Sequence, residues 1–355
     1  MKPIIVFRKL HLYVALVIGL FVLVLAVTGA ALVFENEIDR FLNSRLFNVT
    51  PQSQRISLQS AIETVNKTYP QTSATGIRLP ESDDLSFEVS LKNGRAACVN
   101  PYNGEVLGDR DREQSLARLI HLLHTRLLLG PSGETLMGII SGLTFLMALT
   151  GLALWWPRKL LTIKPGSSRK RLNFDLHNVL GIYSLVFLCV ISITGVMIAF
   201  GKTTDAWVKR LNASSDQAAP QSVTDQSPAQ KTTLTLDDAI HIAGQTLPGS
   251  RTTLITVPPP GKAVFLAFQK FPEDRTPAGR SRVHIDQYSG KVLLVENTRT
   301  AETGTRILNL KRSLHTGDVW GWPTRICALL TCLMLVAQTI TGILIWWKPG
   351  KFRLA

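Results

Sequence analysis

Four long stretches of the chain consist of apolar and small residues without a charged side chain. They are Leu12–Phe34, Thr135–Trp156, Asn178–Gly201 and Ile326–Trp347, of 23, 22, 24 and 22 residues. As helices rising about 1.5 Å per residue, each covers roughly 33–36 Å, against about 30 Å for the hydrocarbon core of a bilayer. The pattern therefore predicts an integral membrane α-helical protein with four transmembrane helices.

Between the first and second spans, and again between the third and fourth, the pattern changes to that of small soluble domains. Ser57–Ile62 and Thr235–Ile240 each place a hydroxyl residue before an apolar-periodic run, which is a helix-start signature. Alternating runs at Leu85–Leu91 and Ala263–Phe268 predict strands. Each segment is therefore predicted to form an α+β domain, a helix with a small antiparallel sheet.

The chain contains an internal repeat of this pattern. An offset of 166 residues aligns the first span with the third, and an offset of 191 aligns the second with the fourth. The aligned residues are Leu10-His11 with Leu176-His177, Thr28-Gly29 with Thr194-Gly195, Leu123-His124 with Leu314-His315, and Thr150-Gly151 with Thr341-Gly342. The unit of helix, external domain and helix thus occurs as residues 1–157 and 172–349, which predicts two parallel repeats.

The net charge of +14 at first suggests a nucleic-acid partner, but its distribution argues for a membrane. Twelve basic residues, with no acidic residue among them before Asp175, flank the same ends of the four spans. They are Lys2, Arg8, Lys9, Arg158, Lys159, Lys164, Arg169, Lys170, Arg171, Lys348, Lys351 and Arg353. This positive-inside pattern predicts that both termini are cytoplasmic, and it leaves no support for nucleic-acid binding.

Five of the seven histidines cluster near the predicted membrane interfaces. The repeat makes His11 equivalent to His177 at the cytoplasmic ends of their spans, and His124 equivalent to His315 outside the external ends. His121 has no repeat partner, but it lies three residues before His124 and could replace it on the same helix face. His241 and His284 also lack partners and are interpreted as ordinary residues of the second external domain.

Two pairs of histidines in two layers favour two haem b groups per chain. Haem needs two axial ligands, which helical bundles often supply as histidines, and ionisable groups at membrane depth are usually functional. We therefore pair His11 with His177, and His124 with His315. Zinc usually takes more ligands, often with cysteine, and a proton relay would need acidic residues that the spans lack. A purely structural role for the histidines remains an alternative.

Other features bear on such a site. Every span carries a Thr-Gly pair, which helix packing explains first and room for a flat porphyrin second. Arg126 and Arg312 lie near the outer histidines and could contact haem propionates, or could simply be solvated. No GxGxxG dinucleotide site and no long cytoplasmic segment occurs, so electrons entering there must come from a separate reductase or a membrane quinol.

Three motifs carry a resemblance to a known family. Leu123–Gly130 (LHTRLLLG), Gly151–Pro157 (GLALWWP) and Asp175–Gly181 (DLHNVLG), together with the repeated layout over nearly the whole chain, resemble the PepSY-associated transmembrane family. The first span departs slightly, because Lys9 stands where Asp175 precedes Leu-His in the third, which leaves the ligand untouched. The external domains are too degenerate to identify the family by themselves.

The resemblance implies a location and an activity. Members of this family in Gram-negative bacteria include iron-regulated inner-membrane proteins, some of them haem-containing ferric-siderophore reductases. It implies that the external domains are periplasmic and PepSY-like, and that the partner is a ferric siderophore whose Fe(III) is reduced to weakly bound Fe(II). Two other interpretations remain: a non-redox siderophore permease or binding protein, and a PepSY-type regulatory membrane protein. No catalytic residue is predicted.

The predicted parts follow in chain order. They are a first membrane helix with a short cytoplasmic N-terminus (1–34), a first PepSY-like domain (35–117), an interfacial helix with the second membrane helix (118–157), a basic cytoplasmic loop (158–175), the third membrane helix (176–201), a stalk and flexible linker (202–231), a second PepSY-like domain (232–310), an interfacial segment with the fourth membrane helix (311–347) and a cytoplasmic tail (348–355).

Overall fold

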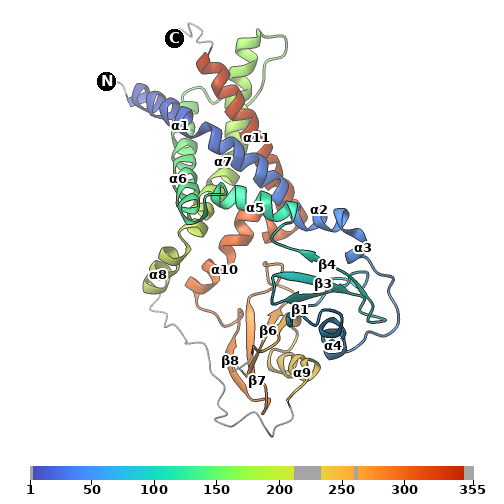
Figure 1. Ribbon diagram of the computed structural model, residues 1–355. Coiled ribbons are helices and arrows are strands. Elements are labelled where there is room, and N and C mark those ends of the chain that lie inside the picture. The colour runs from blue at the N-terminus through green and yellow to red at the C-terminus, as the bar shows by residue number, and fades with distance from the viewer. Residues whose placement is uncertain (1–2, 212–232, 260–262, 348–355) are drawn as a thin grey trace. The chain divides into compact units, whose positions relative to one another are not determined.

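The computed structural model of the chain describes residues 3–211, 233–259 and 263–347 (Figure 1). The chain divides into two compact units, which are described separately. The helical unit comprises Met1–Glu35, Leu119–Val208 and Leu310–Ala355, and the sheet unit comprises Asn36–Arg118 and Lys209–Asn309. The flexible linker predicted within 202–231 falls mostly on residues 212–232, and the predicted tail on 348–355, and both of these lie outside the described residues.

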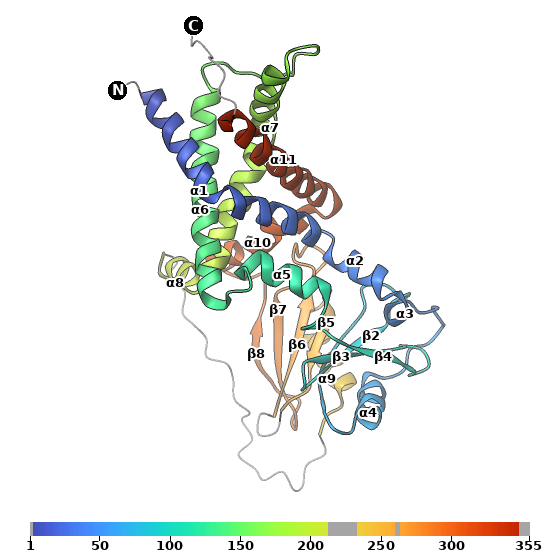
Figure 2. The same ribbon diagram turned by 45° about the horizontal axis from the view of Figure 1, so that its top comes forward.

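Four long apolar helices make up most of the helical unit. They are α1 (Pro3–Leu32), α6 (Gly130–Trp155), α7 (Arg169–Ala199) and α11 (Trp322–Trp347). Both α1 and α7 pack against α6 and α11, so α1 and α7 occupy diagonal positions of a four-helix bundle, as Figures 1 and 2 allow the reader to follow. The diagonal places residues from the two halves of the chain on opposite sides of the bundle interior.

The surface of this bundle suits lipid. All four helices are long and apolar enough to cross a membrane, so the four charge-free segments do form helices that are candidate spans. Large apolar side chains point outward, with Val17 72% and Val186 70% exposed. Two helices begin earlier than their charge-free segments, because α1 starts at Pro3 and α7 at Arg169. The predicted loop 158–175 is therefore shorter than expected, since basic residues at a helix end can keep their charges in the headgroup layer.

Two shorter helices precede the second and fourth long helices. α5 (Leu116–Arg126) leads into α6 through Leu127 and Leu128, which both have positive φ angles of 47° and 62°. A Cβ on Gly133 would lie 1.7 Å from the Arg126 carbonyl oxygen, so only glycine lets the end of α5 rest on the first turn of α6. In the second half, α10 (Thr303–Thr316) and a short 3₁₀ turn η2 (Asp318–Trp320) precede α11, while α8 (Gly201–Leu211) follows α7.

The sheet unit is built around one eight-stranded antiparallel sheet. Its strands are β1 (Ala74–Arg78), β2 (Phe87–Leu91), β3 (Arg95–Val99), β4 (Val106–Asp111), β5 (Arg251–Thr256), β6 (Val264–Lys270), β7 (Ser281–Asp286) and β8 (Val292–Glu296). Their order is β4-β3-β2-β1-β5-β6-β7-β8. The sequence predicts two separate small sheets, whereas in the structure β1 pairs with β5 and joins them into one.

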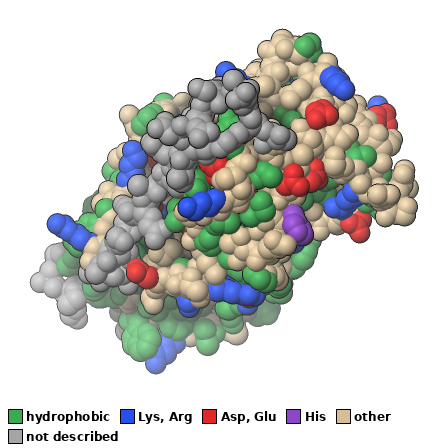
Figure 3. Space-filling view, turned by 90° about the horizontal axis from the view of Figure 1, so that it is seen from below, with side chains coloured by type: hydrophobic (Ala, Val, Ile, Leu, Met, Phe, Trp, Pro, Cys, Tyr) green, Lys and Arg blue, Asp and Glu red, His purple; other side chains and the backbone are tan. Residues whose placement is uncertain are grey.

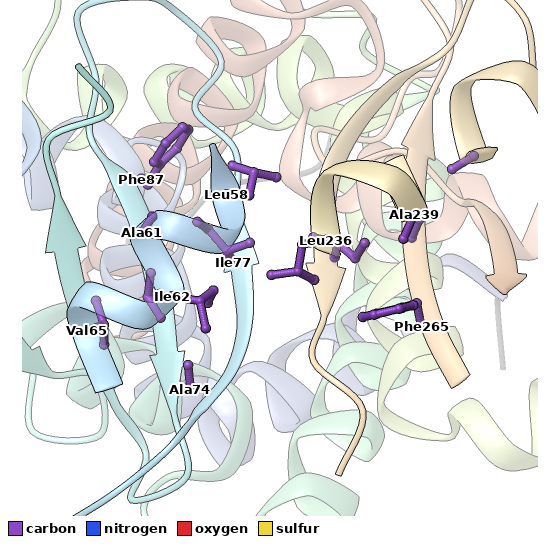
Figure 4. Close-up of a cluster of buried hydrophobic side chains, with 14 of the residues drawn as sticks. Leu58, Ala61, Ile62, Val65, Ala74, Ile77, Phe87, Leu236, Ala239 and Phe265 are labelled. Carbon is purple, nitrogen blue, oxygen red and sulfur yellow. The ribbon is translucent and has the colours of Figure 1, made fainter. Parts of the chain in front are cut away.

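One helix from each half covers the sheet. α4 (Leu58–Thr68) begins at the N-cap Ser57 and α9 (Leu236–Thr246) at the N-cap Thr235, as the sequence predicts. The two helices contact each other, and their apolar faces share one core with the strands. Figure 4 shows this core, to which Leu58, Ala61, Ile62, Val65, Ile77 and Phe87 contribute from the first half and Leu236, Ala239 and Phe265 from the second.

Two short helices, α2 (Glu35–Leu42) and α3 (Ser44–Phe47), contribute to the first half of the sheet unit. There Arg110 of β4 pairs with both Asp39 of α2 and Glu88 of β2, and it stacks on the ring of Phe47. The charged groups thus neutralise one another in a partly buried network. On the molecular face seen in Figure 3, basic, acidic and apolar side chains are interspersed.

Candidate functional site

The structure brings His11 and His177 together inside the bundle. His11 belongs to α1 and His177 to α7, the diagonal helices, and their ring centres lie 6.4 Å apart with the ring planes at 87°. Each histidine sits eight residues after the first residue of its helix rather than at the helix end. Because diagonal helices face each other across the bundle interior, this inner pair points into the core that helical bundles use for cofactors.

A second pair consists of His124 and His315. His124 is on α5 and His315 on α10, and their ring centres lie 6.2 Å apart at an interplanar angle of 61°. This outer pair joins the two residues that the repeat makes equivalent. His121, the alternative to His124, is also on α5 and is half-buried, but it is His124 whose ring centre lies 6.2 Å from that of His315.

The spacing of both pairs fits two imidazoles bound to one metal ion. A metal–nitrogen bond of about 2.0 Å and about 1.1 Å from that nitrogen to the ring centre give about 6.2 Å between ring centres across an iron atom. The observed separations are 6.4 Å and 6.2 Å. Two imidazoles per layer would also supply the two protein ligands that a haem iron can take. Within residues 3–211, 233–259 and 263–347, no group of three or more His, Cys, Asp or Glu is placed to hold a metal ion.

The four rings share one pattern of hydrogen bonds. The Nδ1 atom of each lies within hydrogen-bond distance of a threonine hydroxyl on a neighbouring helix: His11 with Thr150 at 2.9 Å, His124 with Thr28 at 2.9 Å, His177 with Thr341 at 3.1 Å, and His315 with Thr194 at 3.2 Å. These are the threonines of the four Thr-Gly pairs. With Nδ1 engaged in every case, Nε2 is the ring nitrogen left for a metal.

The arginines proposed for haem propionates lie close to the outer histidines in sequence but have other surroundings. Arg126 forms an ion pair with Glu134, with 3.1 Å between Nη2 and Oε2. Arg312 is exposed, one helical turn before His315 on α10. Of the two cations next to them, Arg118 pairs with Glu113 at 2.9 Å and Lys311 with Asp205 at 2.6 Å. Contact with propionates thus stays a prediction for Arg126 and Arg312.

Two residues beside the outer pair were not singled out from the sequence. A Cβ built on Gly29 would lie 3.5 Å from Cys332 Sγ, and one on Gly195 would lie 2.5 Å from Ser141 Oγ. Cys332 and Ser141 are 191 residues apart, so the offset that aligns the second and fourth spans also aligns them. The repeat offset is therefore the sequence signal that could have identified these two residues.

The remaining two histidines lie in the sheet unit. His241 Nε2 is 2.9 Å from the side-chain nitrogen of Gln245 on the same helix, and His284 Nε2 is 3.4 Å from Glu296 on the neighbouring strand. Both contacts are local to the second half of the sheet unit. They agree with the interpretation of these residues as ordinary members of that domain.

Comparison with known proteins gives one family. Residues 8–348 match the family described as the PepSY-associated TM region, which is nearly the whole chain. The match takes in α1 from residue 8 onward, the other three long helices, both halves of the sheet and all four paired histidines. Among curated proteins, none matches the chain significantly.

Proposed function

The chain belongs to the PepSY-associated transmembrane family, and we propose that it is a dihaem b reductase of a bacterial inner membrane. In this proposal electrons cross from the cytoplasmic face to the periplasm and reduce Fe(III) held by a siderophore, so that Fe(II) is released. The observation that carries the proposal is the arrangement of four histidines as two facing imidazole pairs in two layers of one helical unit.

The separation of the two layers follows from the helices. On α1, His11 and the threonine that contacts His124, Thr28, are 17 residues apart, or about 25 Å at 1.5 Å per residue. On α7, His177 and Thr194 have the same spacing. The layers therefore span most of a hydrocarbon core of about 30 Å. Haem b bound in both layers would supply a one-electron carrier near each side of the membrane.

The charge pattern supports one direction of electron flow. Arg8 and Lys9 lie directly before His11 on α1, and Arg169, Lys170 and Arg171 open the helix that carries His177. Basic residues of this kind mark the cytoplasmic side, so the inner pair receives the electrons and the outer pair delivers them. In this proposal the segments between the first and second spans and between the third and fourth are periplasmic, and with them the sheet unit.

The chemistry of the substrate fits a one-electron carrier. Siderophores bind iron through hard oxygen ligands, which favour Fe(III) over Fe(II), so one added electron weakens the complex. The electron donor is a cytoplasmic reductase or a membrane quinol, because the sequence has no dinucleotide-binding motif of its own. The outer pair, with Arg312 and Lys311 on α10 nearby, is the end of the path from which a ferric chelate is reduced.

The test is a visible spectrum of the protein purified in detergent from a haem-replete host. We expect b-type bands in the oxidised and dithionite-reduced states, two haems per chain, and reoxidation of the reduced protein by a ferric siderophore. His11→Ala and His315→Ala should each remove one haem, and from different layers. His121→Ala is the matched control on α5 and should keep both haems, whereas His124→Ala should lose one.

Other outcomes would favour the alternatives. A protein without haem bands would favour a permease, a siderophore-binding protein or a PepSY-type regulator. Haem bands without reoxidation by any ferric siderophore would keep the dihaem electron path and overturn the substrate. Loss of a haem in His121→Ala but not in His124→Ala would exchange the roles of these two residues.

A further inference from the structure

We propose that the four Thr-Gly pairs are positioning elements for the paired histidines: they hold each ring with its proton on Nδ1, so that its Nε2 would be free to bind haem iron. The inference rests on the proposed function and assigns roles to residues that helix packing alone would otherwise explain. It is carried by a geometry that recurs four times, once in each long helix.

The first step concerns the direction of the hydrogen bonds. A threonine hydroxyl has one proton, and Thr28, Thr194 and Thr341 each lie within 2.6–2.8 Å of the carbonyl oxygen four residues earlier, to which that proton is donated. Thr150 donates instead to the Met147 carbonyl oxygen, three residues earlier, at 3.0 Å. The hydroxyl oxygen is then an acceptor, so the histidine must donate from Nδ1.

A second acceptor leads to the same conclusion. The Nδ1 atom of His177 lies 3.2 Å from the Gln338 carbonyl oxygen, and that of His315 lies 3.0 Å from the Ile191 carbonyl oxygen. Met147 and Leu25, which stand at the equivalent positions, also hydrogen-bond to His11 and His124 through their backbone. In each case the carbonyl belongs to the residue three positions before the threonine. A carbonyl oxygen only accepts, so Nδ1 carries the proton and the Nε2 lone pair is free to bind metal.

The glycine of each pair lies against a histidine ring, and at Gly29, Gly195 and Gly342 a side chain would crowd that ring. A Cβ on Gly342 would lie 3.3 Å from His177 Cε1, and one on Gly151 would lie 3.5 Å from His11 Cε1. For Gly29 and His124 the distance is 3.2 Å, and for Gly195 and His315 it is 3.3 Å. Contacts of 3.2–3.3 Å are tighter than ordinary van der Waals spacing, so a methyl group there would press the ring out of place.

The contacts are reciprocal within each half of the chain. In the first half, Thr150 of α6 holds His11 of α1, while Thr28 of α1 holds His124 of α5, which leads directly into α6. In the second half, Thr341 of α11 holds His177 of α7, and Thr194 of α7 holds His315 of α10. Each half therefore orients its own two ligands, and each haem site takes one ligand from each half.

The physical consequence is a change in reduction potential. A histidine that donates its Nδ1 proton to an acceptor becomes a more basic ligand, which favours Fe(III) and lowers the potential of the haem. Removing the threonine hydroxyl leaves one acceptor fewer on the ring. We therefore expect Thr→Val at any of the four positions to raise the potential of the haem in that layer and to leave the other haem unchanged.

The experiment is a redox titration of the dihaem protein followed by its visible spectrum. Thr150→Val should shift the inner haem upward, and Thr28→Val the outer haem, while the serine variants at these positions should restore the wild-type potentials. Thr144→Val is the matched control for Thr150, because Thr144 lies on the same helix, is 7% exposed against 8%, and also donates to a backbone carbonyl, at 2.8 Å. Thr339→Val is the corresponding control for Thr341 on α11.

Glycine variants test the proposal through haem occupancy, which does not depend on reduction potentials. Gly342→Ala should lower the occupancy of the inner haem, whereas Gly181→Ala on α7 should not, because a Cβ there meets nothing within 4 Å. Haem occupancy and reduction potentials equal to those of the wild type in all four Thr→Val variants would overturn the positioning role alone. So would a potential shift in Thr144→Val as large as that in Thr150→Val. Loss of haem in Thr150→Val with rescue by serine, and none in Thr144→Val, would support it. A wild-type protein without haem would overturn the proposed function and this inference together.

Discussion

Ile77 and Ile255 stand directly opposite each other where β1 pairs with β5, and both side chains are fully buried. They are 178 residues apart, the same offset that relates Leu58 of α4 to Leu236 of α9. Equivalent residues of the two halves thus meet each other at the centre of the sheet. The two sheet-forming segments fold as one unit because this strand pair and the shared core cover surface that neither half buries alone.

Ile77→Ala should destabilise both halves of the sheet together. Removing a buried isoleucine side chain typically costs about 2–5 kcal/mol, and the cavity lies at the seam between the halves. Hydrogen exchange followed by mass spectrometry should show faster exchange in β2 of the first half and β6 of the second, by similar factors. Thr75→Ala, an exposed change on the same strand, is the control. Faster exchange confined to the first half would mean that the two halves unfold independently.

Much of the helical unit could be predicted from the sequence, because charge-free apolar length is a direct requirement of a bilayer. The repeat also selected the histidines whose rings face each other, His11 with His177 and His124 with His315. Pairing by equivalence works here since each half of the chain supplies one member of each pair. Whether the pairs hold haem stays a prediction.

The pairing of β1 with β5 and the role of the threonines could not be predicted in the same way. Alternating strands show which face is buried but not which edge is paired, so nothing in Arg251–Thr256 indicates that the sheet continues into the first half. Thr-Gly in a membrane helix fits close helix packing equally well. Only the positions of the rings, with Nδ1 next to each hydroxyl, separate the two interpretations.

Asp237→Ala should destabilise the helix α4 of the other half. Asp237 lies 2.9 Å and 3.1 Å from the backbone nitrogens of Leu58 and Gln59, so its carboxylate accepts hydrogen bonds from the first turn of α4. An anionic cap of this kind contributes about 1–2 kcal/mol. Exchange of α4 amides should rise several-fold in Asp237→Ala and less in Asp237→Asn, which keeps one acceptor. Equal exchange in wild type and both variants would show that the contact stabilises nothing.

Glu88→Gln should make the stability of the sheet unit depend less on pH in the acidic range. Burial by itself raises the pKa of Glu88, but the guanidinium groups of Arg112 and Arg110 outweigh it and hold the pKa below its ordinary value of 4.5. A depressed pKa means that the unfolded chain binds more protons, so this stability is present above the ordinary pKa and is lost as the pH falls through the folded-state pKa.

The measurement for Glu88 is the thermal unfolding midpoint between about pH 3 and pH 7. Wild type should lose stability more steeply toward acid than Glu88→Gln, although the variant should be less stable at neutral pH because Arg110 and Arg112 lose their carboxylate. Glu63→Gln, a change of an exposed glutamate on α4, should keep the wild-type slope. Parallel curves for wild type and Glu88→Gln would refute this account of the charge network.

Cys98 should be inert in the folded protein and should play no part in reducing iron. A thiolate is an alternative one-electron donor to Fe(III), so the only cysteine of the sheet unit needs to be tested. Cys98 on β3 is fully buried, and burial, with Glu88 nearby, raises the pKa of its thiol to about 11. Maleimide at neutral pH should therefore label the Cys98 peptide only after denaturation, as seen by mass spectrometry.

Cys98→Ser should reduce a ferric siderophore at the wild-type rate once the haems are reduced. Rapid labelling of the folded protein, or loss of iron reduction in Cys98→Ser with both haems retained, would place the thiol in the electron path.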